Sequence, residues 1–335
     1  MNEVKRALVA YGLEKLAEVT GEDANQLVVE LGERATLDRY EALLGGTGQR
    51  EEEVLSSIFS YIALRDKEQP PLTYLAARPL ALDEQTLFPV SPEGARKKSN
   101  LGELWQGFVG EYDQLRQRFG QDIEAFFEGF YHLYHKYAWA MPCTYGERGV
   151  SLFEQWKAVA ALVFASGGAT EPASNFTLIG GDVPGIQDFV YTITSKGAAK
   201  GLRGRSLFIQ LMGDAVVRRL VHELELSQAN VIYAAGGNFM LLAPAGQNTR
   251  DVLSEVNKDV NRTLLKTYDG DIALCLAHVS MPAEAVGTAE FGAKYSLKLK
   301  EALGQQKARR FMEIANETGG WEKVFKPKGG GGERA

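Results

Sequence analysis

The stretch from Gly180 to Ser206, GGDVPGIQDFVYTITSKGAAKGLRGRS, contains the residue types best suited to binding phosphate. It combines four cationic side chains with several glycines and the start of a helix, and cationic side chains and helix N-termini both attract anions. The stretch lacks the GxxxxGK[ST] pattern of a P-loop, so a solvated basic loop is the alternative. The candidate anion-binding residues are Asp182, Gly185, Gln187, Lys196, Lys200, Arg203, Arg205 and Ser206.

The segment 231–243, VIYAAGGNFMLLA, is a second candidate. Two apolar runs flank Gly236-Gly237, which is typical of a tight β-hairpin. The glycines either only form the turn or also let a base or phosphate approach the backbone, so Gly236, Gly237 and Asn238 join the candidate residues. Two-metal phosphoryl chemistry requires carboxylates, and because the hairpin has none we expect no metal there. Only Tyr233 and Phe239 are placed to stack on bases.

Histidines provide a weaker lead. His132 and His135 have the HxxH spacing of some metal ligands, but they lie in an aromatic-rich segment. We therefore expect one partly buried and one exposed histidine and no metal site. No histidine is followed by aspartate, so a His-Asp phosphohydrolase centre is not encoded.

The composition is that of an ordinary globular protein. Of its 335 residues, 45% are hydrophobic and 24% are charged, and no uncharged apolar run reaches transmembrane length. The two cysteines, Cys143 and Cys275, are isolated, which favours a reducing cytoplasm, and the lack of a transmembrane-length apolar run predicts no membrane partner. The formal charge is −8 over residues 1–170 and +2 over residues 171–335. A nucleotide or nucleic acid would therefore be expected to contact the second half.

The first 170 residues show mainly helical periodicity. Helices are predicted over residues 4–20, 51–67, 101–120, 122–141 and 151–166, with a long connection between Asp66 and Asn100. Ser151 and Glu154 have the spacing of a capping box at the start of the last helix. The stretch 166–174, SGGATEPAS, predicts a domain boundary.

The second half alternates strands with helices. A strand over 175–185, a short helix over 185–194, a long helix over 202–226, the hairpin, a helix over 247–267 and a strand over 271–281 give the order of a ferredoxin-like fold. The predicted class is α+β with an antiparallel sheet, and the predicted domains are 1–170, 171–285 and a helix with a glycine-rich linker over 286–335. The long helix is expected to face inward with Leu207, Leu211, Val217, Leu220, Val221 and Leu224.

Three motifs in this half resemble one known family. The sequences GIQxF, KGAAKxLRGRS and YxxGGxF occur in this order within residues 185–239. Together they resemble the first palm domain of the large subunit of type III CRISPR effector complexes, the Cas ten family. The segment 137–165 is similar to the last helices of that family's HD-type domain. The resemblance covers about residues 125–330, and residues 1–120 match only as a helical region.

The resemblance implies a composite site. In the family, two palm domains make cyclic oligoadenylates from ATP when a foreign transcript pairs with the guide RNA. The second palm holds Mg or Mn with a GGDD hairpin, and the first has a degenerate hairpin. ATP would therefore be a shared ligand of this chain. Its implied partners are the other type III subunits, guide and target RNA, and a second palm domain in the same or another chain.

The sequence also departs from the family. It has neither GGDD nor the four-cysteine zinc module that usually follows the first palm. Glu154-Gln155 stands where nuclease-active members carry Asp-His, and glutamine does not replace imidazole as a ligand. We therefore expect the chain to be inactive without a second palm. The alternatives are a scaffold or RNA-binding subunit with no nucleotide site and, more weakly, a residual nuclease using His132 and His135.

Overall fold

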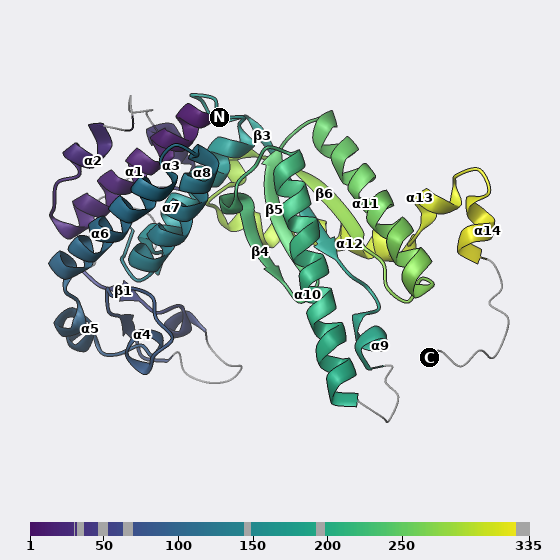
Figure 1. Cartoon of the computed structure of the whole chain (residues 1–335), viewed down its shortest axis with the longest axis horizontal. Coiled ribbons are helices and arrows are strands. Elements are labelled where there is room, and N and C mark those ends of the chain that lie inside the picture. Colours follow the sequence, from purple (N-terminus) through teal and green to yellow (C-terminus); the bar gives the residue numbers. More distant parts are fainter. Residues whose placement is uncertain are drawn as a thin grey trace. The chain divides into compact units, whose positions relative to one another are not determined.

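The computed structural model describes residues 1–29, 31, 37–45, 53–62, 70–143, 149–191 and 198–325 (Figure 1). The chain divides into two compact units. Unit 1 is Met1–Ala173 with Val286–Thr288, and unit 2 is Ser174–Ala285 with Ala289–Ala335. The sequence placed this division at residue 170. None of the described helices is both long and apolar enough to span a membrane.

Unit 1 is built around four helices, α1 (Asn2–Thr20), α6 (Leu101–Phe119), α7 (Ile123–Ala138) and α8 (Leu152–Ala165). Ser151 caps α8 by accepting a hydrogen bond from the Glu154 amide at 3.1 Å, so one half of the predicted capping box is present. The core is aromatic: Phe130 and Trp156 are fully buried with ring centroids 5.6 Å apart. The shorter helices α2 (Asn25–Val29) and α3 (Asp38–Leu43) accompany the four.

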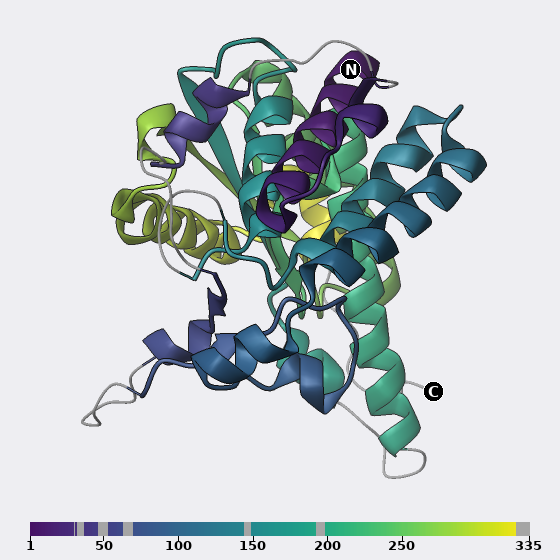
Figure 2. The ribbon, with the colours of Figure 1, turned by 90° about the vertical axis from the view of Figure 1, so that its left-hand side faces the viewer.

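The helix predicted over residues 51–67 is wrong for its described part, residues 53–62. Strand β1 (Leu55–Ser56) pairs with β2 (Tyr74–Leu75), and a 3-10 turn covers Ile58–Tyr61. The segment bonds residues 73–75 instead of forming a helix: the Ser57 amide donates to the Thr73 carbonyl at 2.8 Å, and the buried Ser60 hydroxyl bonds the Thr73 hydroxyl at 3.0 Å. The connection predicted between Asp66 and Asn100 also contains two short helices, α4 (Glu84–Leu87) and α5 (Pro92–Lys98). Figure 2 shows these short elements grouped at one end of the helices of unit 1.

Unit 2 contains a four-stranded antiparallel sheet. Its strands are β3 (Asn175–Asp182), β4 (Val231–Ala235), β5 (Asn238–Pro244) and β6 (Cys275–Pro282), in the order β4-β5-β3-β6. Helices α9 (Ile186–Tyr191) and α10 (Ala198–Glu223) connect β3 to β4, and α11 (Gln247–Tyr268) connects β5 to β6. The predicted α+β class and ferredoxin-like element order are confirmed.

Helices pack on the sheet from both sides. Helices α10 and α11 pack together against the strands, and α12 (Leu297–Ala308) packs on β3 and β6. A Cβ at Gly180 would point towards Leu299 and Leu303 of α12, whereas one at Gly181 would point into the Phe239 ring. Successive residues of a strand face opposite sides, so β3 identifies the two faces. Unit 2 also contains a π-helical turn over Phe291–Ser296, α13 (Met312–Ala315) and α14 (Gly320–Phe325).

The inward face predicted for α10 is wrong in its first half. Leu207 and Leu211 are 58% and 57% exposed, while Leu220 is fully buried. The reason is that Ile209 lies against the hairpin turn, whereas Leu207 and Leu211 are two residues before and after it and so face about 200° away around the helix. The first part of α10 also extends past the ends of β4 and β5 (Figure 1).

Candidate functional site

The predicted hairpin is present, and its two glycines differ in surroundings. Ala235 pairs with Asn238, and positive φ angles of 60° and 81° at Gly236 and Gly237 make the turn type I′. A Cβ on Gly237 would lie 2.7 Å from Ile186 Cδ1, so this glycine accommodates the chain's own side chains. A Cβ on Gly236 would meet nothing within 4 Å. Gly236 is therefore the position at which another molecule can reach the turn backbone.

A polar cluster adjoins the turn on the α12 side of the sheet. We call it the hairpin corner and define it as Asp182, Tyr233, Asn238 and Lys307. Asp182 lies opposite Asn238 across β3 and β5, and its carboxylate forms an ion pair with the Lys307 ammonium. The Tyr233 hydroxyl donates to Asn238 Oδ1 at 2.5 Å. Partial burial, assisted by the charge of Asp182, raises the pKa of Tyr233, so its hydroxyl remains a donor at neutral pH.

The predicted cationic residues lie on the early turns of α10. Lys200 and Arg203 are exposed and have no carboxylate partner among the described residues, and Ser206 is exposed on the same part of the helix. Arg205 is less exposed: it donates to the Phe189 carbonyl at 2.5 Å and lies over the Phe189 ring. Lys196 lies outside the described residues.

The two remaining candidates lie at the turn between β3 and α9. Gly185 has a φ of 90°, and a Cβ there would lie 2.3 Å from the Asp271 carbonyl oxygen. Its lack of a side chain is thus explained by contact with the chain's own backbone. Gln187 is exposed at the start of α9.

The structure separates the predicted residues into two groups. The first group meets at the turn and consists of Asp182, Gly236, Gly237 and Asn238. The second group is on the early turns of α10. There, Arg203 precedes Ile209, the residue beside the turn, by six positions, so it lies about 9 Å from Ile209 along the helix axis. On the α10 side of the turn, the cavity between the helix and the hairpin measures only about 10 Å³, enough for about one water molecule.

The sequence analysis did not identify some residues that lie at the site. Lys307 reaches Asp182 from a helix on the opposite side of the sheet from α10. Gln210 and Asp214 of α10 line the cavity beside the turn and are hydrogen-bonded to each other at 3.0 Å. Phe239, a predicted stacking residue, is 1% exposed and cannot contact a base.

The histidines of unit 1 lie as expected. His132 is exposed, and His135 is partly buried with its ring stacked on Phe153 at a centroid distance of 4.2 Å. Within the described ranges, no group of three His, Cys, Asp or Glu side chains is placed to hold a metal. Gln155 is buried at the position where the family's active nucleases carry histidine.

His135 predicts a pH dependence for unit 1. Burial lowers its pKa from the ordinary 6.5, outweighing the opposing charge of Glu154. The stability contributed by the neutral ring is therefore complete above about pH 6.5 and is lost as the pH falls through the lowered folded-state value. The urea midpoint of unit 1 should fall between pH 7.5 and 5, and less so in His135→Phe. His132→Phe, at an exposed position, should retain the full decrease; an unchanged decrease in His135→Phe would contradict the assignment.

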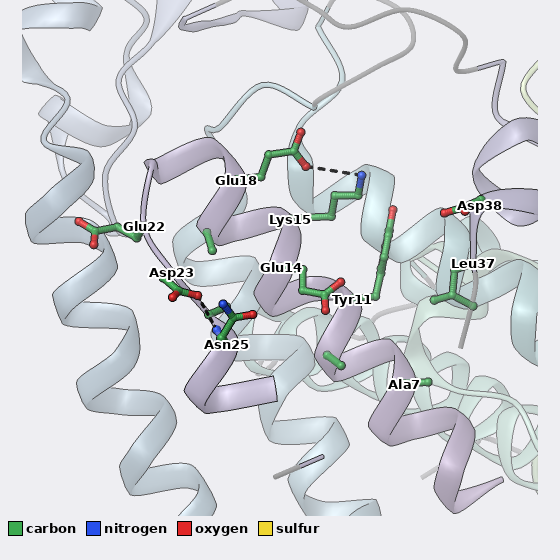
Figure 3. Close-up of a pocket in the computed structure, with 13 residues that line it drawn as sticks. Ala7, Tyr11, Glu14, Lys15, Glu18, Glu22, Asp23, Asn25, Leu37 and Asp38 are labelled. Carbon is green, nitrogen blue, oxygen red and sulfur yellow. Dashed lines mark hydrogen bonds and ion pairs between the residues drawn. The ribbon is translucent and has the colours of Figure 1, made fainter. Parts of the chain in front are cut away.

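Unit 1 contains a larger cavity that does not suit a nucleotide. It measures about 540 Å³ and lies along α1 (Figure 3). Its polar lining is mainly acidic and includes Glu14, Glu18, Glu22 and Asp23, while Lys15 is held by Glu18 at 3.6 Å and by Glu41 at 3.2 Å. Such a surface repels phosphate.

Comparison with known proteins gives a consistent result for unit 2. Residues 175–323 match the family described as Csm1 subunit domain B. A Cas10/Csm1 from Thermococcus onnurineus, named a CRISPR system single-strand-specific deoxyribonuclease of subtype III-A, is 33% identical over 49% of this chain and 23% of its own length. Its counterpart from Methanocaldococcus jannaschii is 27% identical over 51% of this chain and 26% of its own length. The matched segments span about a quarter of these relatives.

Solved structures share the fold. The Csm1–Csm4 cassette in complex with cA4 has a TM-score of 0.65 and 22% identity, covering 93% of this chain and 47% of that chain. The same cassette with one ATP has a TM-score of 0.63 and 22% identity, covering 96% and 48%. On the family match and these relatives, residues 175–323 are identified as a Csm1 domain B, and the chain is similar to the Cas10/Csm1 large subunits of type III CRISPR effector complexes.

Proposed function

We propose that this chain supplies the non-catalytic palm of a composite ATP site that makes cyclic oligoadenylates in a type III CRISPR complex. The observation that carries the proposal is the type I′ turn of a Csm1 domain B, which is open at Gly236 and has no carboxylate in its hairpin. Such a turn can receive a nucleotide but cannot hold its metals.

The carboxylates nearest the turn do not converge. Asp182 lies on the α12 side and is neutralised by Lys307, whereas Asp214 lies on the α10 side, where Gln210 donates to it. A metal pair needs carboxylates that face a common space. The Mg or Mn ions would therefore be held by the second palm, and this palm would contribute backbone and cationic contacts to the shared ATP.

The cations on α10 would bind phosphate. Lys200 and Arg203 are exposed and have no carboxylate partner within the described part of the chain, so they can bind phosphate groups of ATP or RNA without breaking an ion pair. Lys196 and Ser206 would join them. Arg205, bound to Phe189, would instead fix α9 against α10, and Gly185 and Gln187 would shape the approach to the turn.

The proposed partners follow from the relatives. Solved structures similar to this chain include Csm1–Csm4 cassettes in complex with ATP and with cA4. We propose that this chain likewise assembles with other type III subunits around guide and target RNA in the cytoplasm. The curated relatives are named single-strand-specific deoxyribonucleases. Because the described residues of unit 1 contain no group of three side chains placed to hold a metal, and Gln155 is not a metal ligand, we propose that unit 1 does not cleave DNA.

The composite site predicts that ATP binding depends on the second palm. ATP affinity, measured by isothermal titration, should rise at least tenfold when the chain is combined with a palm domain that carries GGDD. Lys200→Ala with Arg203→Ala should weaken that binding, while Arg218→Ala, at an exposed position farther along α10, should not. A chain that assembles with its partners but adds nothing to ATP affinity would favour the second candidate function, a scaffold or RNA-binding subunit.

A further inference from the structure

We infer that Tyr233 is the platform on which a nucleobase stacks when a nucleotide occupies the hairpin, an inference that rests on the proposed function. The exposed aromatic residues in the described part of unit 2 are Tyr191, Tyr233, Trp321 and Phe325. Trp321 and Phe325 stack on each other in α14, and Tyr191 ends α9. Only Tyr233 belongs to the hairpin, three residues before the open Gly236, and its side chain is 44% exposed.

The other side of the turn is closed to a base. Phe239, the second aromatic residue of the hairpin, is buried over Gly181. The α10-side cavity beside the turn holds about 10 Å³, far less than a nucleobase needs. A base that approaches Gly236 must therefore lie on the α12 side or beyond the end of the hairpin, where the Tyr233 ring is available.

The hairpin corner holds this ring in place. The hydroxyl of Tyr233 is fixed by Asn238, Asn238 lies opposite Asp182, and Asp182 is bound by Lys307. Three strands and one helix thus contribute to one preorganised surface, which reduces the entropy lost on binding. The Asn238 Nδ2 group makes no hydrogen bond within the described part of the chain, so it remains able to donate to an acceptor on a base edge.

If Tyr233 stacks on the base, then part of the affinity for ATP depends on the base. Stacking of one base on an aromatic side chain raises affinity by about five- to 150-fold. The phosphates would gain nothing from this ring. Loss of the ring should therefore weaken ATP binding while leaving the binding of a phosphate chain without a base unchanged.

The test uses the full chain assembled with its second palm and other subunits. Affinities for ATP and for inorganic tripolyphosphate are measured by isothermal titration for the unaltered chain, Tyr233→Phe, Tyr233→Ala and the matched control Tyr191→Ala. We expect Tyr233→Ala to lose about tenfold or more in ATP affinity and less than twofold in tripolyphosphate affinity. Tyr233→Phe, which keeps the ring, should stay within about threefold for both ligands, and Tyr191→Ala should change neither.

Each contrary outcome has a distinct meaning. Unchanged ATP affinity in Tyr233→Ala, or an equal loss for ATP and tripolyphosphate, would overturn the stacking role and leave the proposed function standing. Failure of the unaltered complex to bind ATP would overturn both. Thermal unfolding of each variant checks folding, and if Tyr233→Ala is destabilised, Tyr233→Leu provides a second ring-free variant for the same comparison.

Discussion

Replacing Gly181 with alanine is expected to destabilise unit 2 by about 3 kcal/mol, at the upper end of the cost of overpacking a buried site. A Cβ on Gly181 would lie 2.0 Å from Phe239 Cζ, and the Phe239 ring is 1% exposed. Because the two residues are directly paired across β3 and β5, the ring lies over the glycine backbone and cannot tilt away without moving its neighbours. Urea unfolding followed by hydrogen exchange in β3 and β5 measures the loss.

Two further variants make this expectation specific. Gly180→Ala, one residue earlier, points to the other face, where the nearest atoms are side-chain carbons of Leu299 and Leu303 at 3.0 Å, and it should cost much less stability. Phe239→Leu should partly relieve Gly181→Ala, because the smaller side chain vacates the space that the new methyl needs. The double variant should then be more stable than the sum of the single losses predicts. If Gly181→Ala is as stable as the unaltered chain, or if the losses of the two single variants simply add in the double variant, the Phe239 ring is not what excludes a side chain at residue 181.

A different pair of glycines explains why the hairpin of the sheet was predictable from the sequence. The pair Gly236-Gly237 between two apolar runs specifies a type I′ hairpin, and this turn fixes the pairing of β4 with β5 as far as Tyr233 and Met240, beyond which the register shifts. The helices of unit 1 were predictable where apolar periodicity was long, as in α6 and α7. Periodicity failed at residues 53–62, where Ser57 and the buried Ser60 hydrogen-bond Thr73. The spacing of apolar residues within one segment cannot predict these hydrogen bonds, because their partner Thr73 belongs to another segment.

Half of the candidate site was also accessible from the sequence. The motifs identified Asp182 and Asn238, and the antiparallel register brings them together. What the sequence could not show is the face on which each residue lies. Leu207 and Leu211 fit an apolar stripe, but the helix turns Ile209 towards the hairpin, so these two leucines face away from it.

The partners of the hairpin corner depend on tertiary structure. Lys307 meets Asp182 only because α12 packs on the sheet face opposite α10, and no local pattern in a charged helix indicates this. Likewise, Tyr233 and Phe239 look equivalent in the sequence, and only strand alternation and the position of α10 bury one and expose the other. Burial therefore selects Tyr233 over Phe239 as a base-contacting residue.

The largest functional effect is expected at Gly236. In the assembled complex, Gly236→Phe should lower cyclic oligoadenylate synthesis at least a hundredfold, because a bulky side chain would occupy the open space at the turn and displace the nucleotide. Misplacement of reacting groups by about 1 Å is enough for a loss of this size. The product is quantified by chromatography after activation with target RNA.

Gly236→Ala is the matched control. Both substitutions place a non-glycine residue at a φ of 60°, which costs about 1–2 kcal/mol in either case, so they share the backbone strain and differ in volume. No atom of the described chain lies within 4 Å of the new Cβ, so the added Cβ itself should not disturb the packing of unit 2 in either variant. Gly236→Ala should keep most of the activity. Equal losses in the two variants would assign the effect to strain, and full activity in Gly236→Phe would mean that the nucleotide does not approach this turn, leaving unit 2 as a scaffold.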